Sequence, residues 1–217
     1  MPFIEFTVRL ICENSEPDNL VPLFHGTIFE FGEEVGDEPV KIGEIEFHLL
    51  QRGRALNEGL SLFEAADCVD DDLGECYKAV FDGKGETDWS KEVRDLYKGQ
   101  IVGLDALFIR RIELEPNWRG KGVGAQVVRE TISAFSSSCG VVVCKPFPIQ
   151  YVGWMDEERK GSREKPGFET QRLADFAKVR RFWTRLGFAR LGDSDFYAHA
   201  PELVNQPIPG GGTGRIQ

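Results

Sequence analysis

The chain has 217 residues, of which 41% are hydrophobic and 29% are charged, and its formal net charge at pH 7 is −10. The length suits one large domain with a proper core, and the composition is ordinary for a soluble globular protein. The acidic balance argues against a nucleic-acid binder that works through bulk electrostatics. No apolar run approaches the roughly 18 residues that a membrane span needs, so we expect neither nucleic acid nor membrane as a partner.

The start of the chain and its cysteines point to a reduced compartment. The opening MPFIEFTVRL carries an acidic residue early and lacks the layout of a signal peptide. The five cysteines are odd in number and fit neither a metal-binding spacing nor a disulfide framework. We therefore expect a cytoplasmic protein without a metal, whose cysteines pack in the interior where they lie in or near strands, as Cys139 and Cys144 do.

The first 50 residues predict three strands. FIEFTVRLIC at 3–12, LFHGTIFEF at 23–31 and KIGEIEFHLL at 41–50 each contain apolar residues in alternation or in short runs. The acidic, glycine-rich stretch before the third strand suits a hairpin loop. In the third strand the apolar side chains of Ile45, Phe47 and Leu49 alternate with Glu44, Glu46 and His48.

The period then changes to that of a helix. From Ser61 to Val80 apolar residues recur at helical spacing, with Asp70, Asp71 and Asp72 facing outward. Ser61 and Glu64 form a capping-box pattern at its start. A loop follows, and VGLDALFIRRIELEP at 102–116 predicts a strand that Pro116 ends.

The second half of the chain alternates between helix and strand. A helix is predicted to about residue 136, and GVVVCK at 140–145 predicts a central strand because it is apolar on both faces. The segment 146–167 has no clear period, and a helix over 168–186 precedes two short strands, 188–192 and 195–200. We expect one α/β domain over residues 1–200 and a low-complexity tail over 201–217.

A glycine-punctuated turn, EPNWRGKGVGAQVV at 115–128, separates the strand ending at Pro116 from the next helix. Glycines allow another group to approach the backbone closely, and helix N-termini favour anions. The P-loop pattern fails because Lys121 is followed by Gly122 and not by Ser or Thr. An ordinary glycine-rich connection is the plainest alternative.

The dinucleotide-binding pattern G-x-G-x-x-A is satisfied by Gly120, Gly122 and Ala125. Two observations count against it. Residues 117–119 separate the strand from the glycines, where that fold turns directly, and the following strand ends in Cys144 and Lys145 without a ribose-binding acid.

A third pattern fits better: Arg/Gln-x-x-Gly-x-Gly/Ala after a strand that ends in apolar-x-apolar-x-Pro. Its glycines let backbone N–H groups at a helix N-terminus converge on a pyrophosphate, which the helix dipole favours. The matching residues are Arg119, Gly122 and Gly124 in the turn and Ile112, Leu114 and Pro116 in the strand.

A second motif lies in FAKVRRFWTRLGFARLG at 176–192, where a helix ends on Leu186-Gly187-Phe188 and a strand follows. The two motifs, in this order and spacing, resemble the GNAT superfamily of acyl-CoA N-acyltransferases over about residues 105–197. That resemblance implies a mixed, largely antiparallel central sheet, splayed at two strands and flanked by helices. The only long early helix follows the third strand here, so we expect a rearranged N-terminal half.

The resemblance also implies acetyl-CoA as co-substrate and an amine as acceptor, which would attack the acetyl carbonyl directly. The pantetheine arm would lie between the strand over 102–116 and the strand over 140–145, and the pyrophosphate on the glycine turn. The residues expected to bind the cofactor are Ile112, Leu114, Arg119, Gly120, Lys121, Gly122, Val123, Gly124, Ala125 and Trp183.

The catalytic residues are less clear, because Trp183 stands where the family commonly has a Tyr that protonates the leaving thiolate. An indole N–H donates a hydrogen bond but does not act as a general acid. Trp183 therefore either lines the thiol pocket or belongs to the hydrophobic core. Tyr197 and Tyr151 are substitute acids by residue type, with Tyr197 preferred, and Asp105 is the candidate base. We expect the histidines to be packing or surface residues.

For the acceptor, the resemblance points to the segment that leaves the strand over 140–145. Phe147, Tyr151 and Trp154 present aromatic faces that suit an alkylammonium or a flat amine, and the alternative is that they pack that segment onto the domain. The acidic helix with Asp67 and Asp70 to Asp72 would flank the same mouth. A non-catalytic acyl-CoA-binding sensor or scaffold remains the alternative function, and a homodimer is compatible with either.

Overall fold

The computed structural model of the chain describes residues 3–9, 20–30, 38–82, 88–151 and 167–201. These residues form a seven-stranded mixed sheet in the order β1-β2-β3-β4-β5-β7-β6. All neighbouring strands are antiparallel except β4 and β5, which are parallel. The strands are β1 (Phe3–Arg9), β2 (Leu23–Glu30), β3 (Val40–Leu50), β4 (Asp105–Leu114), β5 (Cys139–Cys144), β6 (Ala189–Arg190) and β7 (Tyr197–His199).

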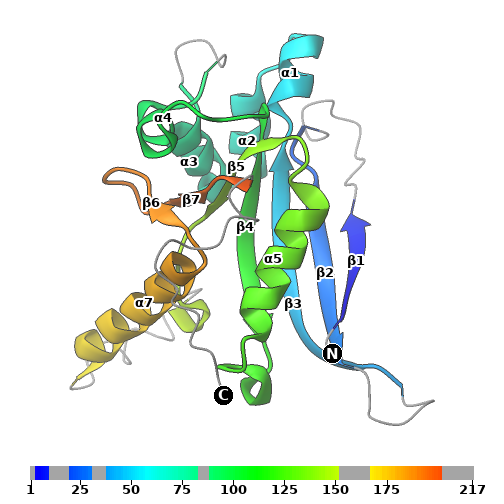
Figure 1. Cartoon of the computed structure of the whole chain (residues 1–217), viewed down its shortest axis with the longest axis vertical. Helices are drawn as coiled ribbons and strands as arrows, with labels where there is room; N and C mark the ends of the chain where they lie inside the picture. The colour runs from blue at the N-terminus through cyan, green and yellow to red at the C-terminus, as the bar shows by residue number, and fades with distance from the viewer. Residues whose placement is uncertain (1–2, 10–19, 31–37, 83–87, 152–166, 202–217) are drawn as a thin grey trace, which may run out of the picture.

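Helices cover both faces of this sheet, as Figure 1 shows. Four short helices come between β3 and β4 in the chain, α5 connects the two parallel strands, and α7 leads into β6. In Figure 1, α5 lies in front of the sheet, whereas α7 projects away from it beside β6 and β7. The helices are α1 (Arg52–Glu58), α2 (Leu62–Val69), α3 (Asp71–Val80), α4 (Lys91–Tyr97), α5 (Val123–Phe135) and α7 (Phe168–Arg185).

Two apolar clusters hold these layers together, one on each face. Leu73 of α3 belongs to the first, together with Phe108 of β4. Val127 of α5 belongs to the second, with Ile109 of β4 and Trp183 of α7. Because Phe108 and Ile109 are neighbours on one strand, β4 buries side chains on both faces and is the common wall of the two clusters.

The strand predictions are confirmed in type and order. Ile45 and Phe47 are fully buried while Glu44 and Glu46 are half-buried, as the alternation in β3 predicts. Every residue of β5 is buried, which agrees with a central strand, and Cys139 and Cys144 pack there as free thiols. Helices follow the third strand in the chain, as the sequence predicts.

The single helix predicted from Ser61 to Val80 is wrong, because two helices occupy this stretch. Ser61 caps α2 by accepting the Glu64 N–H, 3.2 Å away, as predicted. The chain then breaks at Asp70, whose backbone is extended and whose carboxylate accepts the Leu73 N–H at 2.8 Å. Asp70 is therefore an N-cap for α3 and not an outward residue in the middle of a helix.

Other differences concern elements that sequence periodicity does not reveal. The seven-residue helices α1 and α4 were missed, and β4 begins at Asp105, three residues later than predicted. His48 is buried and not on a solvated face. Its Nδ1 lies 3.2 Å from the Val21 carbonyl oxygen, which gives this buried ring nitrogen a polar partner. Cys12, Trp154 and the tail from residue 202 onward lie outside the described residues.

Asp70 has a second contact, since its carboxylate pairs with Arg110 of β4 at 3.0 Å. We expect Asp70→Ala to lower the free energy of unfolding by about 1–3 kcal/mol, because both the helix cap and the ion pair are lost. Asp70→Asn keeps an N-capping oxygen, so it should lose only the ion pair, at most about 1 kcal/mol. Urea denaturation measures both.

The control is Asp71→Ala, which removes an exposed carboxylate from the adjacent position. Its effect should stay within about 0.5 kcal/mol. If Asp70→Ala changed the stability no more than Asp71→Ala, the cap and the ion pair would not hold α3 in place.

Candidate functional site

The two parallel strands separate halfway along β4. Their pairing runs from Asp105 opposite Cys139 to Ile109 opposite Cys144 and then stops. β4 nevertheless continues to Leu114, and its pairing with β3 continues with it. Among the described residues, the second half of β4 therefore has a strand partner on one side only, which is the splay that the resemblance implied.

Two local features cause this separation. The register between β3 and β4 skips one residue, because Glu46 lies opposite Arg111 whereas Phe47 lies opposite Ile109. The extra residue, Arg110, is a β-bulge, and a bulge bends its strand. On the other strand, Pro146 follows soon after Cys144 and has no N–H with which to extend the ladder.

The open edge of β4 turns backbone hydrogen-bonding groups toward the gap. The Glu115 N–H donates to the Ile42 carbonyl at 2.9 Å, so the peptide groups of Glu115 face β3. Because an antiparallel ladder alternates, the N–H and C=O groups of Leu114 and Ile112 face the opposite way. A hydrogen bond supports this direction: the Leu114 carbonyl accepts from Arg119 Nε at 2.7 Å, and Arg119 lies on the side of β4 away from β3.

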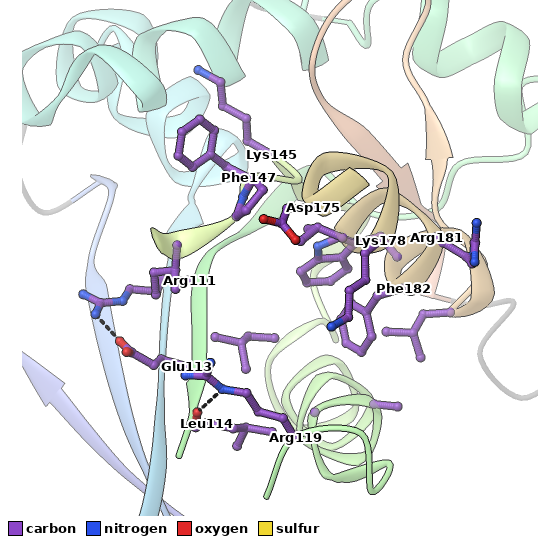
Figure 2. Close-up of a pocket in the computed structure, with 18 of the residues that line it drawn as sticks. Arg111, Glu113, Leu114, Arg119, Lys145, Phe147, Asp175, Lys178, Arg181 and Phe182 are labelled. Atoms are coloured by element: carbon purple, nitrogen blue, oxygen red, sulfur yellow. Dashed lines mark hydrogen bonds and ion pairs between the residues drawn. The ribbon is translucent and has the colours of Figure 1, made fainter. Parts of the chain in front are cut away.

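A large pocket, about 2090 Å³ in volume, occupies the gap. Its walls come from the second half of β4, the start of α5, the segment after β5 and one side of α7. Figure 2 shows Lys145 and Phe147 at one end, Leu114 and Arg119 at the other, and the α7 side chains along the wall. Of the ten residues predicted to bind a cofactor, the pocket is lined by Ile112, Leu114, Arg119, Gly120, Gly122, Gly124, Ala125 and Trp183.

The other two residues of that prediction lie beside the pocket without lining it. Lys121 places its Nζ 5.0 Å from the centre of the Trp118 ring, a cation–π contact on the turn. Val123 is buried in the cluster beneath α5.

The glycine turn leaves the N-terminus of α5 open to the pocket. Gly120 and Gly122 have positive φ angles of 77° and 85°, which strain any other residue, and no side chain caps the helix. The first N–H groups of a helix have no acceptor within it. Val123 and Gly124 are in these positions, so their N–H groups are available to an anion.

Cations without acidic partners line this side of the pocket, although the whole chain is acidic. Among the described residues, no carboxylate lies within ion-pair distance of the five cations that line it here. They come from the turn, from α5 and from the second half of α7: Arg119, Arg129, Lys178, Arg181 and Arg185.

At the opposite end the cations are neutralised by α3. Lys145 Nζ, just after β5, donates to Asp72 at 2.7 Å and to Glu75 at 2.8 Å. Burial alone would lower the pKa of Lys145, but these two hydrogen bonds outweigh it and raise that pKa. With the pair between Asp70 and Arg110, α3 holds both diverging strands. Of the acidic run, Asp72 therefore lines the pocket, and both Asp70 and Asp72 are paired with cations.

Trp183 is 7% exposed and lines the pocket while it packs against Phe188, with ring centres 4.9 Å apart. The two sequence interpretations, pocket wall and core residue, are therefore compatible.

Neither residue predicted to be catalytic lines the pocket. Asp105 starts β4 at the far end, where its carboxylate accepts the Gly53 N–H at 2.9 Å, and Tyr197 is half-buried on β7, opposite Cys144.

The predicted acceptor residues divide into three cases. Phe147 is 45% exposed and lines the pocket, where its ring meets Phe176 edge-on at 5.3 Å. Tyr151 also lines the pocket but is only 8% exposed, and its hydroxyl donates to Asp175 at 2.9 Å. Desolvation, and then this hydrogen bond, raise the pKa of Tyr151. Trp154 lies outside the described residues. Asp175 also lines the pocket, but the sequence does not predict it, because nothing in a helical pattern marks one carboxylate as pocket-facing.

None of the three histidines lines the pocket. His48 and His199 are buried, and His25 lies 3.4 Å from Glu46 on the sheet. No group of three or more metal-ligating side chains gathers in the parts of the chain that the structure describes. Among the same residues, no helix is both long and apolar enough to cross a membrane.

Comparisons with known proteins add little. No family model matches the chain, and no curated protein matches it. A solved KacTA–DNA complex matches at 14% identity and a TM-score of 0.41, covering 85% of this chain and 71% of that chain. A KacT mutant matches at 14% identity and a TM-score of 0.40, covering 85% and 74%. Such values are too low to assign a family or a function.

The buried His48 should make folding sensitive to mild acid. Burial, and to a smaller extent the positive charge of Arg110, lower the pKa of His48, although the Val21 carbonyl and the charges of Asp70 and Glu46 act in the opposite direction. The unfolded chain therefore binds a proton at a higher pH than the folded one does. The free energy of unfolding should fall as the pH drops below about 6.5, by at most about 1.4 kcal/mol per pH unit for this side chain.

His48→Leu should reduce the loss of stability between pH 7 and pH 5, as measured by urea denaturation at each pH. His25→Gln, a change at a histidine whose side chain is 36% exposed, is the control and should keep the wild-type loss. An identical pH dependence in wild type and His48→Leu would show that His48 does not carry this effect.

Proposed function

We propose that the protein is an acyl-CoA-dependent N-acetyltransferase of the GNAT type, which moves an acetyl group from acetyl-CoA to an amine. One observation supports this above the others. The open edge of β4 leads directly into the uncapped N-terminus of α5, and both line the same pocket. That continuity suits an extended arm that carries a polyphosphate at its end.

In this proposal each part of acetyl-CoA has its own place. The pyrophosphate binds the N–H groups of Val123 and Gly124, with Arg119 and the cations of α5 and α7 around it. The pantetheine arm lies along β4, where the peptide groups of Ile112 and Leu114 face it. Trp183 walls the part of the gap that receives the thioester.

The bound thioester supplies an activated acetyl group. The amine must first lose a proton, after which its nitrogen forms a bond to the acetyl carbon. The bond between that carbon and sulfur breaks, and the sulfur takes up a proton, so that an amide and free CoA result. A backbone N–H of the open edge would stabilise the negative charge that develops on the acetyl oxygen, and positioning in the gap would supply much of the rate.

A second function has an observation in its favour. Asp105 and Tyr197 lie outside the pocket, and Trp183 offers no acidic proton, so the chain would also suit a protein that binds acyl-CoA without using it. Thiol release from acetyl-CoA separates the two functions. Release that depends on an added amine supports the enzyme, whereas tight CoA binding without release over a broad amine panel supports the sensor or scaffold.

The helix N-terminus offers a sharp test of the cofactor site. A Cβ atom added at Gly124 would meet Leu114 and Phe182 at 3.6 Å, an ordinary contact, so a side chain fits there. Gly124→Asp places a negative charge where the pyrophosphate would bind. We expect its CoA affinity, measured by calorimetry, to be roughly 10-fold to 100-fold below that of the neutral, isosteric Gly124→Asn.

Both variants should fold, and Asp in the first turn should even favour the helix. Thermal unfolding checks this point. Gly122 is unsuitable for the experiment because its positive φ would strain any side chain. Equal CoA affinity in wild type, Gly124→Asp and Gly124→Asn would remove this helix N-terminus from the cofactor site.

A further inference from the structure

One carboxylate of the pocket differs from the others in its partners. Glu46, Asp72 and Glu113 each lie beside a positively charged or chargeable side chain: His25, Lys145 and Arg111. Asp175 of α7 does not. Its partners are neutral donors: Tyr151 Oη at 2.9 Å, Gln171 Nε2 at 3.0 Å and the side chain of Gln150. Of the pocket carboxylates in the described chain, it is the one without an ion pair.

These neutral donors fix the direction of the Asp175 side chain. Tyr151 binds one carboxylate oxygen and Gln171 binds the other. With Gln150 as a third donor, the carboxylate keeps one of its four acceptor sites for a further donor. Figure 2 shows the carboxylate pointing from α7 into the pocket, at the end where Lys145 and Phe147 lie. The hydrogen bond from Tyr151 is the main cause that lowers the pKa of Asp175, so the group is charged at neutral pH.

The surroundings of Asp175 are aromatic. Phe147 and Tyr151 line the pocket beside it, and Phe176 backs both of them, with ring centres 5.3 Å from Phe147 and 6.2 Å from Tyr151. A fixed negative charge among aromatic rings attracts an organic cation, because the ring faces and the carboxylate both favour positive charge.

We propose that Asp175 binds the ammonium group of the acceptor, and that Phe147 and Tyr151 contact its carbon skeleton. This inference rests on the proposed acetyl transfer, and it narrows the acceptor to amines that arrive as cations with an apolar or aromatic body. The cations around Arg119 then face the phosphates of the donor, so the two substrates are drawn to different parts of one pocket by opposite charges.

A structural role for Asp175 is the rival explanation, since its bond to Tyr151 also ties the segment after β5 to α7. Lys178, one turn along the same helix, opposes the attraction of Asp175 for a cation by its own positive charge.

The binding role and the structural role of Asp175 predict opposite rankings of two variants by their amine affinity. Asp175→Asn keeps an oxygen that accepts from Tyr151 but removes the charge, whereas Tyr151→Phe removes the hydrogen bond and keeps the charge.

The test is calorimetric binding of phenethylamine, with 2-phenylethanol as its neutral counterpart, to protein saturated with CoA. We expect the wild type to bind the amine more tightly than the alcohol. Asp175→Asn should weaken amine binding by about 10-fold to 100-fold, the usual effect of a hydrogen bond to a charged group, and leave the alcohol unchanged. Tyr151→Phe should weaken amine binding less than Asp175→Asn does.

The control is Glu169→Gln, which makes the same change of charge on the same helix, at a residue that pairs with Arg172 and does not line the pocket. It should leave amine binding unchanged. The inference is overturned if the wild type binds the amine no better than the alcohol, or if Asp175→Asn behaves as Glu169→Gln does. It is also overturned if Tyr151→Phe weakens amine binding as much as Asp175→Asn.

The CoA titration that precedes each experiment separates this inference from the proposed function. If CoA binds and the Asp175 variants behave as the control, the acceptor inference fails and the donor site stands. If CoA does not bind, the proposed function fails, and the amine titrations on the protein without CoA still decide whether Asp175 binds a cation.

Discussion

The separation of β4 from β5 after Ile109 and Cys144 is the constraint on which the site depends. An unbroken ladder would satisfy the peptide groups of the second half of β4 and leave no space between the strands. The bulge at Arg110 and the proline after β5 end that ladder, and α3 then holds the two strands apart through Asp70 and Asp72. The shape of the pocket consequently depends on the helix cap at Asp70 and on the ion pairs of Asp70 and Asp72.

This arrangement also explains how an acidic protein can have a pocket lined on one side by cations. The acidic residues near the pocket are concentrated on α3 and on the exposed sheet, where Arg110, Arg111 and Lys145 neutralise several of them. The cations of the turn, α5 and the second half of α7 that line the pocket have no such partners among the described residues. Net charge therefore says little about the site, because the local field depends on which cations are already paired.

Much of the proposed cofactor side of the pocket could be predicted from sequence, because it depends on local patterns. Glycines in a turn between a strand and a helix determine backbone geometry within a few residues, and Arg119, Gly122 and Gly124, which this pattern predicts, all line the pocket. Asp105, Tyr197 and Asp175 depend on tertiary placement. Asp105 starts β4 far from the pocket, and Asp175 reaches it because α7 packs beside the segment after β5. No periodicity contains that information.

The central claim is that the gap between β4 and β5 binds the arm of an acyl-CoA. Amide hydrogen exchange with and without saturating CoA tests it most directly, because the N–H groups of Ile112 and Leu114 face the gap and have no strand partner there. The account predicts that CoA slows exchange at these two amides and at Gly124. Unchanged exchange at all three, in protein that demonstrably binds CoA, would contradict it.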